Sequence, residues 1–267
     1  MRTRRRQQGL TLIELLIGMV LVGVIMTALM SLNISTGRSS SAIQVRNGLL
    51  AETQTSQNYV VGKLREAAYV FPATTTLALG SSYSVQNPVT GTGSWTVGTH
   101  PIVAFVSPPR TETPVTGGCA GTSTPVIPSQ QACYTLYAYF PVKRSVVTGS
   151  GVGAANPGAD AYNDASVWML MEYRRTYPTI TALSQALASG VGGGEARMVM
   201  DYLRPPATGE TLFSQVDAPG TGAAGVTNVT LSLAALRGGG GAVRVPTSGR
   251  YNVTVYPRNV GKPVVPH

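Results

Sequence analysis

The chain has 267 residues and a formal net charge of +9, from 20 Lys and Arg against 11 Asp and Glu. Charged residues make up only 12 % of the chain and hydrophobic residues 43 %, which excludes a disordered, highly charged protein. Two cysteines and two histidines exclude a disulfide-dense scaffold and a four-cysteine zinc site, and they leave little material for catalysis. We therefore expect a protein that is not an enzyme and uses no cofactor.

The first feature in chain order is a basic segment followed by a long apolar run. Residues 1–9 contain several arginines and no acid, and residues 10–32 carry a single charge, Glu14. As an α-helix this run would be about 35 Å long, enough to cross the core of a bilayer. Arginines on its N-terminal side favour a cytoplasmic N-terminus, with the rest of the chain outside the cytoplasm.

Three interpretations of this segment compete. A cleaved signal peptide is disfavoured because no A-x-A site follows the apolar run. A plain signal anchor leaves Glu14 unexplained, since a carboxylate in an apolar span costs about 2–3 kcal/mol. The third interpretation rests on residues 8–16, with the sequence QGLTLIELL. This stretch resembles the processing motif of type IV prepilins and type II secretion pseudopilins.

The resemblance implies that the N-terminus is cleaved and then methylated. A prepilin peptidase would cut between Gly9 and Leu10, and the new amine of Leu10 would be methylated. Leu10 departs from the phenylalanine that is commonest there, a change that the family tolerates. Glu14 would be the fifth mature residue and a subunit-docking residue, paired with the N-terminal amine of a neighbouring subunit.

The resemblance also implies partners and a location. The partners would be the prepilin peptidase, other major and minor pilins, the inner-membrane assembly platform and the lipid of the inner membrane. The chain would cross the inner membrane once, with a cytoplasmic N-terminus and a periplasmic head. It would then be carried into a pilus at the cell surface.

The next feature is a long helix. No proline occurs between residues 10 and 71, and apolar residues recur at steps of three or four beyond the apolar run. We expect a membrane-spanning and assembly helix over residues 10–32 and an amphipathic continuation over residues 33–71, ending before Pro72. The predicted buried stripe of the continuation consists of Ile43, Leu50, Gln57, Val61, Leu64, Ala68 and Phe71.

Residues 72–267 change to a strand-like pattern and form the predicted extracytoplasmic head. Strands are expected at residues 102–106, 134–140, 167–173, 197–203, 226–233 and 251–256, and a short helix at 179–188. Loops are expected at residues 72–100, 107–132, 144–165, 204–225 and 237–249. Because strand follows strand without regular helical crossovers, the predicted class is α+β: a pilin-like fold with a long N-terminal helix packed on an antiparallel sheet.

The two cysteines are candidates for a disulfide. Cys119 and Cys133 lie in the predicted exported head, where disulfides persist. Closing a loop of this length would stabilise the head by about 3 kcal/mol. The alternative is a pair of free thiols.

Two further sets of residues in the head could either bind a ligand or be ordinary surface residues. Asp160, Asn163 and Asp164 are oxygen donors in one loop and weak candidates for calcium, but their spacing fits no known calcium motif. We favour a solvated turn. Scattered basic residues near tyrosines suit a DNA-binding surface, yet an ordinary basic surface with packed tyrosines is the favoured interpretation.

The size of the head indicates which subunits of this family the chain resembles most. Residues 63–67, 229–233 and 251–259 look like parts of the larger minor subunits, with PilW-type minor pilins and J-type pseudopilins the closest. This implies a minor pilin of the initiation or tip complex, with adhesion, motility or DNA uptake as its context. The alternatives are a type II secretion pseudopilin and a membrane-anchored receptor for DNA or a surface that acts without a filament.

Overall fold

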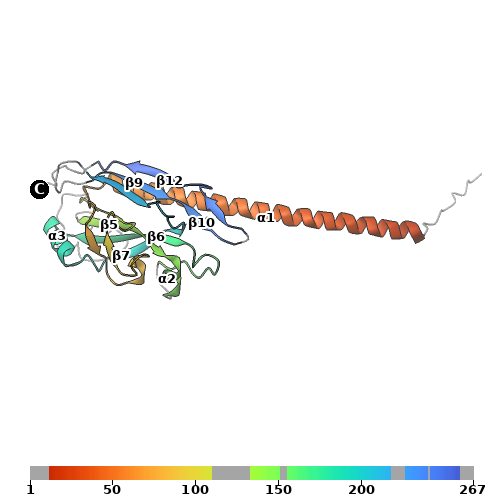
Figure 1. Ribbon diagram of the computed structural model, residues 1–267, viewed down its shortest axis with the longest axis horizontal. Coiled ribbons are helices and arrows are strands. Elements are labelled where there is room, and N and C mark those ends of the chain that lie inside the picture. The colour runs from red at the N-terminus through yellow and green to blue at the C-terminus, as the bar shows by residue number, and fades with distance from the viewer. Residues whose placement is uncertain (1–11, 110–132, 151–154, 218–225, 240, 259–267) are drawn as a thin grey trace, which may run out of the picture. The chain divides into compact units, whose positions relative to one another are not determined.

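The computed structural model describes residues 12–109, 133–150, 155–217, 226–239 and 241–258 (Figure 1). The chain divides into two compact units, residues 1–47 and 48–267, and helix α1 (Leu12–Arg65) passes from the first into the second. The predicted α+β class is confirmed, because a long N-terminal helix is followed by an antiparallel β-sheet head.

The described part of the first unit is the helix over residues 12–47. Its side chains are exposed from residue 12 to residue 44, and they are apolar around the whole circumference up to Leu32. The helix is uninterrupted because this stretch contains no proline.

The part of α1 in the second unit buries one face, which includes Gln57, Val61 and Leu64 of the predicted stripe, while Leu50 is half-buried. Ala68 and Phe71 are also buried, but they lie beyond the end of the helix, and Ile43 of the first unit is exposed. The buried residues of the helix are Leu49, Thr53, Ser56, Gln57, Val60, Val61 and Leu64. Three of these are polar, and they are buried because they find hydrogen-bond partners. The Ser56 hydroxyl, for example, donates to the Val199 carbonyl at 2.8 Å.

The helix ends earlier than predicted, so the boundary at residue 71 is wrong. The amides of Glu66 and Ala67 bond to carbonyls three residues back at 3.1 Å, which tightens the last turn. Ala68 then donates to the Val106 carbonyl at 2.8 Å, and β1 (Tyr69–Val70) pairs with the sheet. Hydrogen bonds to a neighbouring strand therefore replace the helical ones from Ala68 onward, four residues before Pro72.

In the described part of the chain, every strand pair within a sheet is antiparallel. The largest sheet has seven strands in the order β1, β4 (Val103–Ser107), β5 (Tyr134–Lys143), β6 (Trp168–Tyr177), β7 (Glu195–Leu203), β10 (Ala235–Arg237) and β11 (Val243–Val245). A second sheet has the order β12 (Tyr251–Val255), β9 (Val226–Leu233) and β8 (Phe213–Asp217). A third pairs β2 (Thr76–Ala78) with β3 (Ser94–Thr96).

Both faces of the large sheet are covered. On one face, Phe140 of β5 packs against Trp95 of β3, with ring centroids 4.8 Å apart. On the other face, the Lys63 ammonium of α1 lies 5.5 Å from the ring centroid of Tyr137, and Phe105 stacks on the same tyrosine. The central strands are therefore buried on both sides, which explains why β5 contains a nearly continuous apolar run.

The predicted strands are all present, and the predicted helix is α3 (Ile180–Ser189). Thr179 caps α3 by accepting a hydrogen bond from the Ala182 amide at 3.1 Å. The segments predicted as loops are not entirely irregular, because several contain short strands or helices. They contain β2, β3, the 3₁₀ helix η1 (Tyr83–Val85), α2 (Arg144–Gly149), β8 and β11, each three to six residues long, and β10 begins just before the loop predicted at 237–249.

Candidate functional site

The N-terminal half of α1 is the first candidate site. It is the one helix in the described part of the chain that is long and apolar enough to cross a membrane, and none of its most apolar window is buried in the protein. Leu12, Ile13 and Met19 expose 83, 67 and 70 % of their surface. Exposed apolar surface on this scale marks a membrane or protein interaction segment.

Glu14 lies in the first turn of this helix. An acid there interacts favourably with the partial positive charge of the helix N-terminus. Gly9 and Leu10, the predicted cleavage and methylation residues, lie outside the described residues. The structure therefore places Glu14 at the start of the apolar helix, and the cleavage site remains a prediction.

The calcium candidates form a loop in which the protein supplies the hydrogen-bond donors. One Asp160 oxygen accepts from the Asn163 side chain at 2.8 Å and from the Tyr202 hydroxyl at 3.1 Å. The side-chain oxygen Oδ1 of Asn163 accepts from the Gly238 amide at 2.6 Å, and a carboxylate oxygen of Asp164 accepts from Arg144. These contacts give the oxygens a structural role, so we do not propose a calcium site.

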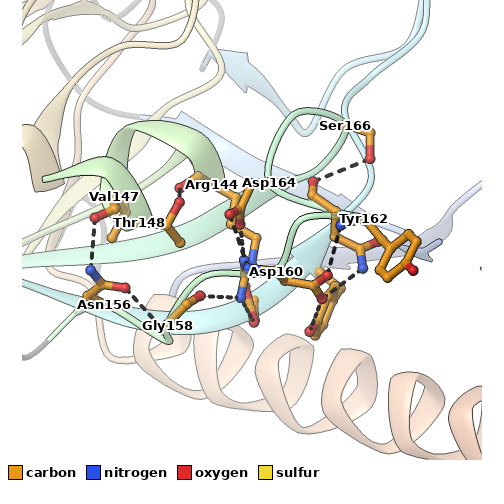
Figure 2. Close-up of polar contacts among 12 residues, drawn as sticks. Arg144, Val147, Thr148, Asn156, Gly158, Asp160, Tyr162, Asp164 and Ser166 are labelled. Carbon is orange, nitrogen blue, oxygen red and sulfur yellow. Dashed lines mark hydrogen bonds and ion pairs between the residues drawn. The ribbon is translucent and has the colours of Figure 1, made fainter. Parts of the chain in front are cut away.

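Arg144 is the centre of this cluster (Figure 2). Its side chain is 2 % exposed, its Nε lies 2.7 Å from one oxygen of Asp201 and its Nη2 lies 3.2 Å from the other. The guanidinium also forms an ion pair with Asp164 and donates to the Gly158 carbonyl at 3.1 Å. Burial alone would lower the pKa of Arg144, but the hydrogen bonds and charges of Asp201 and Asp164 raise it.

The cluster also contacts α1 within the second unit. A Glu52 carboxylate oxygen accepts from the Asp201 amide at 2.7 Å. Burial raises the pKa of Glu52, and the Asp201 amide opposes that shift. On the other side, the guanidinium groups of Arg144 and Arg237 lie 5.4 and 4.8 Å from the ring centroid of Tyr202.

Several basic residues that suggested a DNA surface already have acidic partners. Arg204 and Arg250 both bind Glu210, at 2.8 Å each, and Arg197 binds Glu195 at 3.0 Å. Together with the buried Arg144, these residues do not act as unpaired cations. DNA binding therefore gains no support from these four arginines.

Of the two cysteines, Cys133 lies among the described residues. Cys133 is buried, with 2 % of its surface exposed, directly before β5. Cys119 lies outside the described residues, so the disulfide between them remains a prediction.

Comparison with known proteins identifies the N-terminal segment. Residues 4–30 match the family model described as the prokaryotic N-terminal methylation motif. No curated protein matches the chain, and no solved structure does. The match includes Gly9, Leu10 and Glu14, and together with the long apolar helix and antiparallel head it supports a type IV pilin-like protein.

Proposed function

We propose that this protein is a minor pilin, a structural subunit of the initiation or tip complex of a type IV pilus. The observations that carry the proposal are the methylation-motif match over residues 4–30 and an exposed apolar helix that has Glu14 in its first turn. The role is structural and not catalytic. A type II secretion pseudopilin and a free membrane receptor are the competing functions.

This assignment implies a sequence of processing and assembly steps for the chain. The prepilin peptidase removes residues 1–9 and Leu10 is methylated, while the apolar helix holds the chain in the inner membrane. The head lies in the periplasm until the assembly platform moves the subunit into the fibre. Cleavage before the apolar run keeps the helix in the mature protein, and it also removes the arginines on the cytoplasmic side, so extraction from the bilayer becomes easier.

The test is the N-terminus of protein isolated from membranes and from sheared fibres. Intact-mass and N-terminal peptide analysis should find a mature chain that begins at methylated Leu10. Gly9→Val should block cleavage because a β-branched side chain crowds a site that accepts glycine. Gly18→Val is the matched control, since Gly18 lies inside the same motif and a Cβ there meets no atom within 4 Å.

Two results would contradict the proposal. One is a mature N-terminus beyond Leu32 and the other is an uncut Met1. Loss of pilus-dependent adhesion or motility in a deletion strain, with protein secretion unchanged, favours the pilus over the secretion pseudopilus. The reverse pattern favours the pseudopilin.

A further inference from the structure

The sheet formed by β12, β9 and β8 has one apolar face and one polar, uncharged face. Its three strands contain a single charged residue, Asp217, at the end of β8. Successive side chains of a strand point to opposite sides of the sheet. On one side Val229, Leu231, Leu233 and Val255 are buried in the head. The residues between them form the outward face, which consists of serine, threonine and asparagine with one valine.

The centre of the outward face is a row of hydroxyl groups. Ser214, Thr230 and Thr254 lie opposite one another on the three strands, and the hydroxyl oxygens of the two threonines are 2.9 Å apart. One of these hydroxyls donates to the other, so the pair still offers a hydroxyl hydrogen and acceptor lone pairs to a ligand. Their mutual hydrogen bond also fixes the direction of both side chains.

The rows on either side add amide groups and an aromatic ring. Asn252 lies opposite Ser232, and Asn228 lies opposite Val216. Tyr256 directly follows β12, two residues after an outward threonine, and the alternation places it on the same side. Tyr256 is 65 % exposed and Val216 is 55 % exposed. One end of the face therefore combines an exposed aromatic ring with an amide.

Contacts on the inner side hold this sheet in place. The Gln57 side chain of α1 donates to the Tyr251 carbonyl of β12 at 3.3 Å. The Gln215 side chain of β8 donates to the Phe71 carbonyl at 3.2 Å. Because the strands are tied to the head in this way, the polar groups of the outward face are positioned before a ligand arrives. A ligand that binds them loses less conformational entropy in ordering the site.

The lack of charge on the face restricts the kind of ligand. A soluble surface usually carries charged residues at about a quarter of its positions, and the outward rows of this sheet carry none. The exposed charged residues next to these strands in sequence, Asp217 and Arg258, have opposite signs. Nucleic acid and anionic lipid both require exposed cations, so neither matches this face.

Neutral carbohydrate matches the groups that are present. Hydroxyl and amide groups both donate and accept hydrogen bonds, as sugar hydroxyls do, and a tyrosine ring offers an apolar surface with a polar tip. A protein partner would be expected to bury a larger apolar centre than Val216 and Tyr256 provide. Rows of similar groups repeated across three strands also suit a ligand with a repeating structure.

We propose that the outward face of the β12–β9–β8 sheet binds a neutral polysaccharide. Tyr256 stacks on a sugar ring, and the hydroxyl row around Thr230 and Thr254 exchanges hydrogen bonds with sugar hydroxyls. The inference goes beyond the proposed function, which names no ligand for the head.

The test is sedimentation of the purified full-length chain with microcrystalline cellulose and with chitin, in a detergent that has no sugar headgroup. Both polysaccharides are neutral, and the N-acetyl group of chitin distinguishes them as sources of the ligand. The chain should sediment with at least one of them. Binding should persist when the salt concentration is raised from about 0.1 M to about 1 M, because no ion pair carries it.

Paired variants locate the binding face. Tyr256→Ala should lower the bound fraction several-fold, whereas Tyr162→Ala should not, although Tyr162 is 78 % exposed on another element. Thr254→Val keeps the shape of the side chain and removes the hydroxyl, so it should also weaken binding. Thr76→Val is its matched control, because the Thr76 and Thr96 hydroxyls form a similar pair, 3.1 Å apart, between β2 and β3.

Three results would overturn the polysaccharide site: no sedimentation with either polysaccharide, loss of binding at high salt, or equal effects of the two variants in each pair. The measurement uses the isolated chain and requires neither cleavage nor a fibre. A failure here therefore leaves the pilin assignment standing, and an uncut N-terminus would leave the polysaccharide site standing.

Discussion

Arg144 shows how a single residue can organise a distant part of the head. Its acidic partners Asp164 and Asp201 lie 20 and 57 residues further along the chain. Arg144→Met should lower the free energy of unfolding by about 3–5 kcal/mol, because two partly buried carboxylates lose their common partner. Urea unfolding followed by tryptophan fluorescence of the detergent-solubilised chain measures this change.

A surface ion pair provides the control. Arg197 and Glu195 are 3.0 Å apart, but their side chains are 37 and 30 % exposed. Arg197→Met should therefore change the free energy of unfolding by less than about 1 kcal/mol. Similar losses in the two variants would contradict the role assigned to Arg144.

The ion pairs of Glu210 with Arg204 and Arg250 should be sensitive to acid. The pKa of Glu210 is lowered from 4.5 to about 2, first by the Ala207 amide and then by the Arg250 guanidinium. Because the folded-state pKa lies below the ordinary one, this contact stabilises the head above about pH 4.5. The contribution is lost as the pH falls towards 2.

Glu210→Gln should lower the unfolding midpoint at pH 7 and flatten its decline between about pH 4.5 and pH 2. Unfolding curves at a series of pH values test this, with Glu195→Gln as the control for a more exposed ion pair. Parallel pH profiles for Glu210→Gln and the unaltered chain would show that Glu210 does not carry this dependence.

At the scale of the element, two glycines should respond oppositely to alanine. Gly62 lies in α1, where a Cβ would meet nothing within 4 Å. Gly62→Ala should stabilise the helix by up to about 1 kcal/mol. Gly194 directly precedes β7, and a Cβ there would lie 2.5 Å from the Tyr173 hydroxyl oxygen and 2.7 Å from the Arg174 carbonyl.

Gly194→Ala should therefore destabilise the start of β7, because backbone on one side and a buried tyrosine on the other leave no room. Thermal unfolding of the two variants should move in opposite directions. A neutral Gly194→Ala would mean that β6 and β7 can separate locally at no cost.

Most elements of five residues or more could be predicted from sequence, and those of two or three residues could not. Apolar periodicity identified β5, β6 and β9 because each is at least eight residues long and buried. β10 and β11 have three residues each, too few for a period to be visible. Ser56 was missed on α1 because the burial of its hydroxyl depends on a partner across the head, the Val199 carbonyl. Thr53 is also buried, but its hydroxyl donates to the Leu49 carbonyl of its own helix.

The same limit applies to the candidate sites. Gly9, Leu10 and Glu14 could be found because a local motif defines them within a few residues. The Arg144 cluster unites Glu52, Arg144 and Asp201 from three parts of the chain, and no local pattern connects them. A sequence interpretation could only class Arg144 among scattered basic residues.

At the scale of the whole molecule, the decisive prediction concerns Glu14. Among the described residues of the apolar run, which ends at residue 32, Glu14 is the acidic side chain. An ionisable residue in a membrane span is a functional candidate by default. After cleavage, the amine of Leu10 in a neighbouring subunit could approach it. Two unit charges about 4 Å apart attract by about 4 kcal/mol at an effective dielectric near 20, enough to offset much of the burial cost.

Glu14→Gln keeps the size of the side chain and removes its charge. We expect cleavage after Gly9 to continue, because the peptidase requires the glycine, while the share of this chain in sheared fibres relative to membranes falls. Thr27→Val is the control, since the Thr27 hydroxyl donates to Val24 of its own helix at 2.8 Å and needs no neighbour. A plain signal anchor or a receptor acting alone would be indifferent to both changes. If the ratio for Glu14→Gln equals that of the unaltered chain, Glu14 is not a docking residue, and the filament assignment depends on the cleavage motif alone.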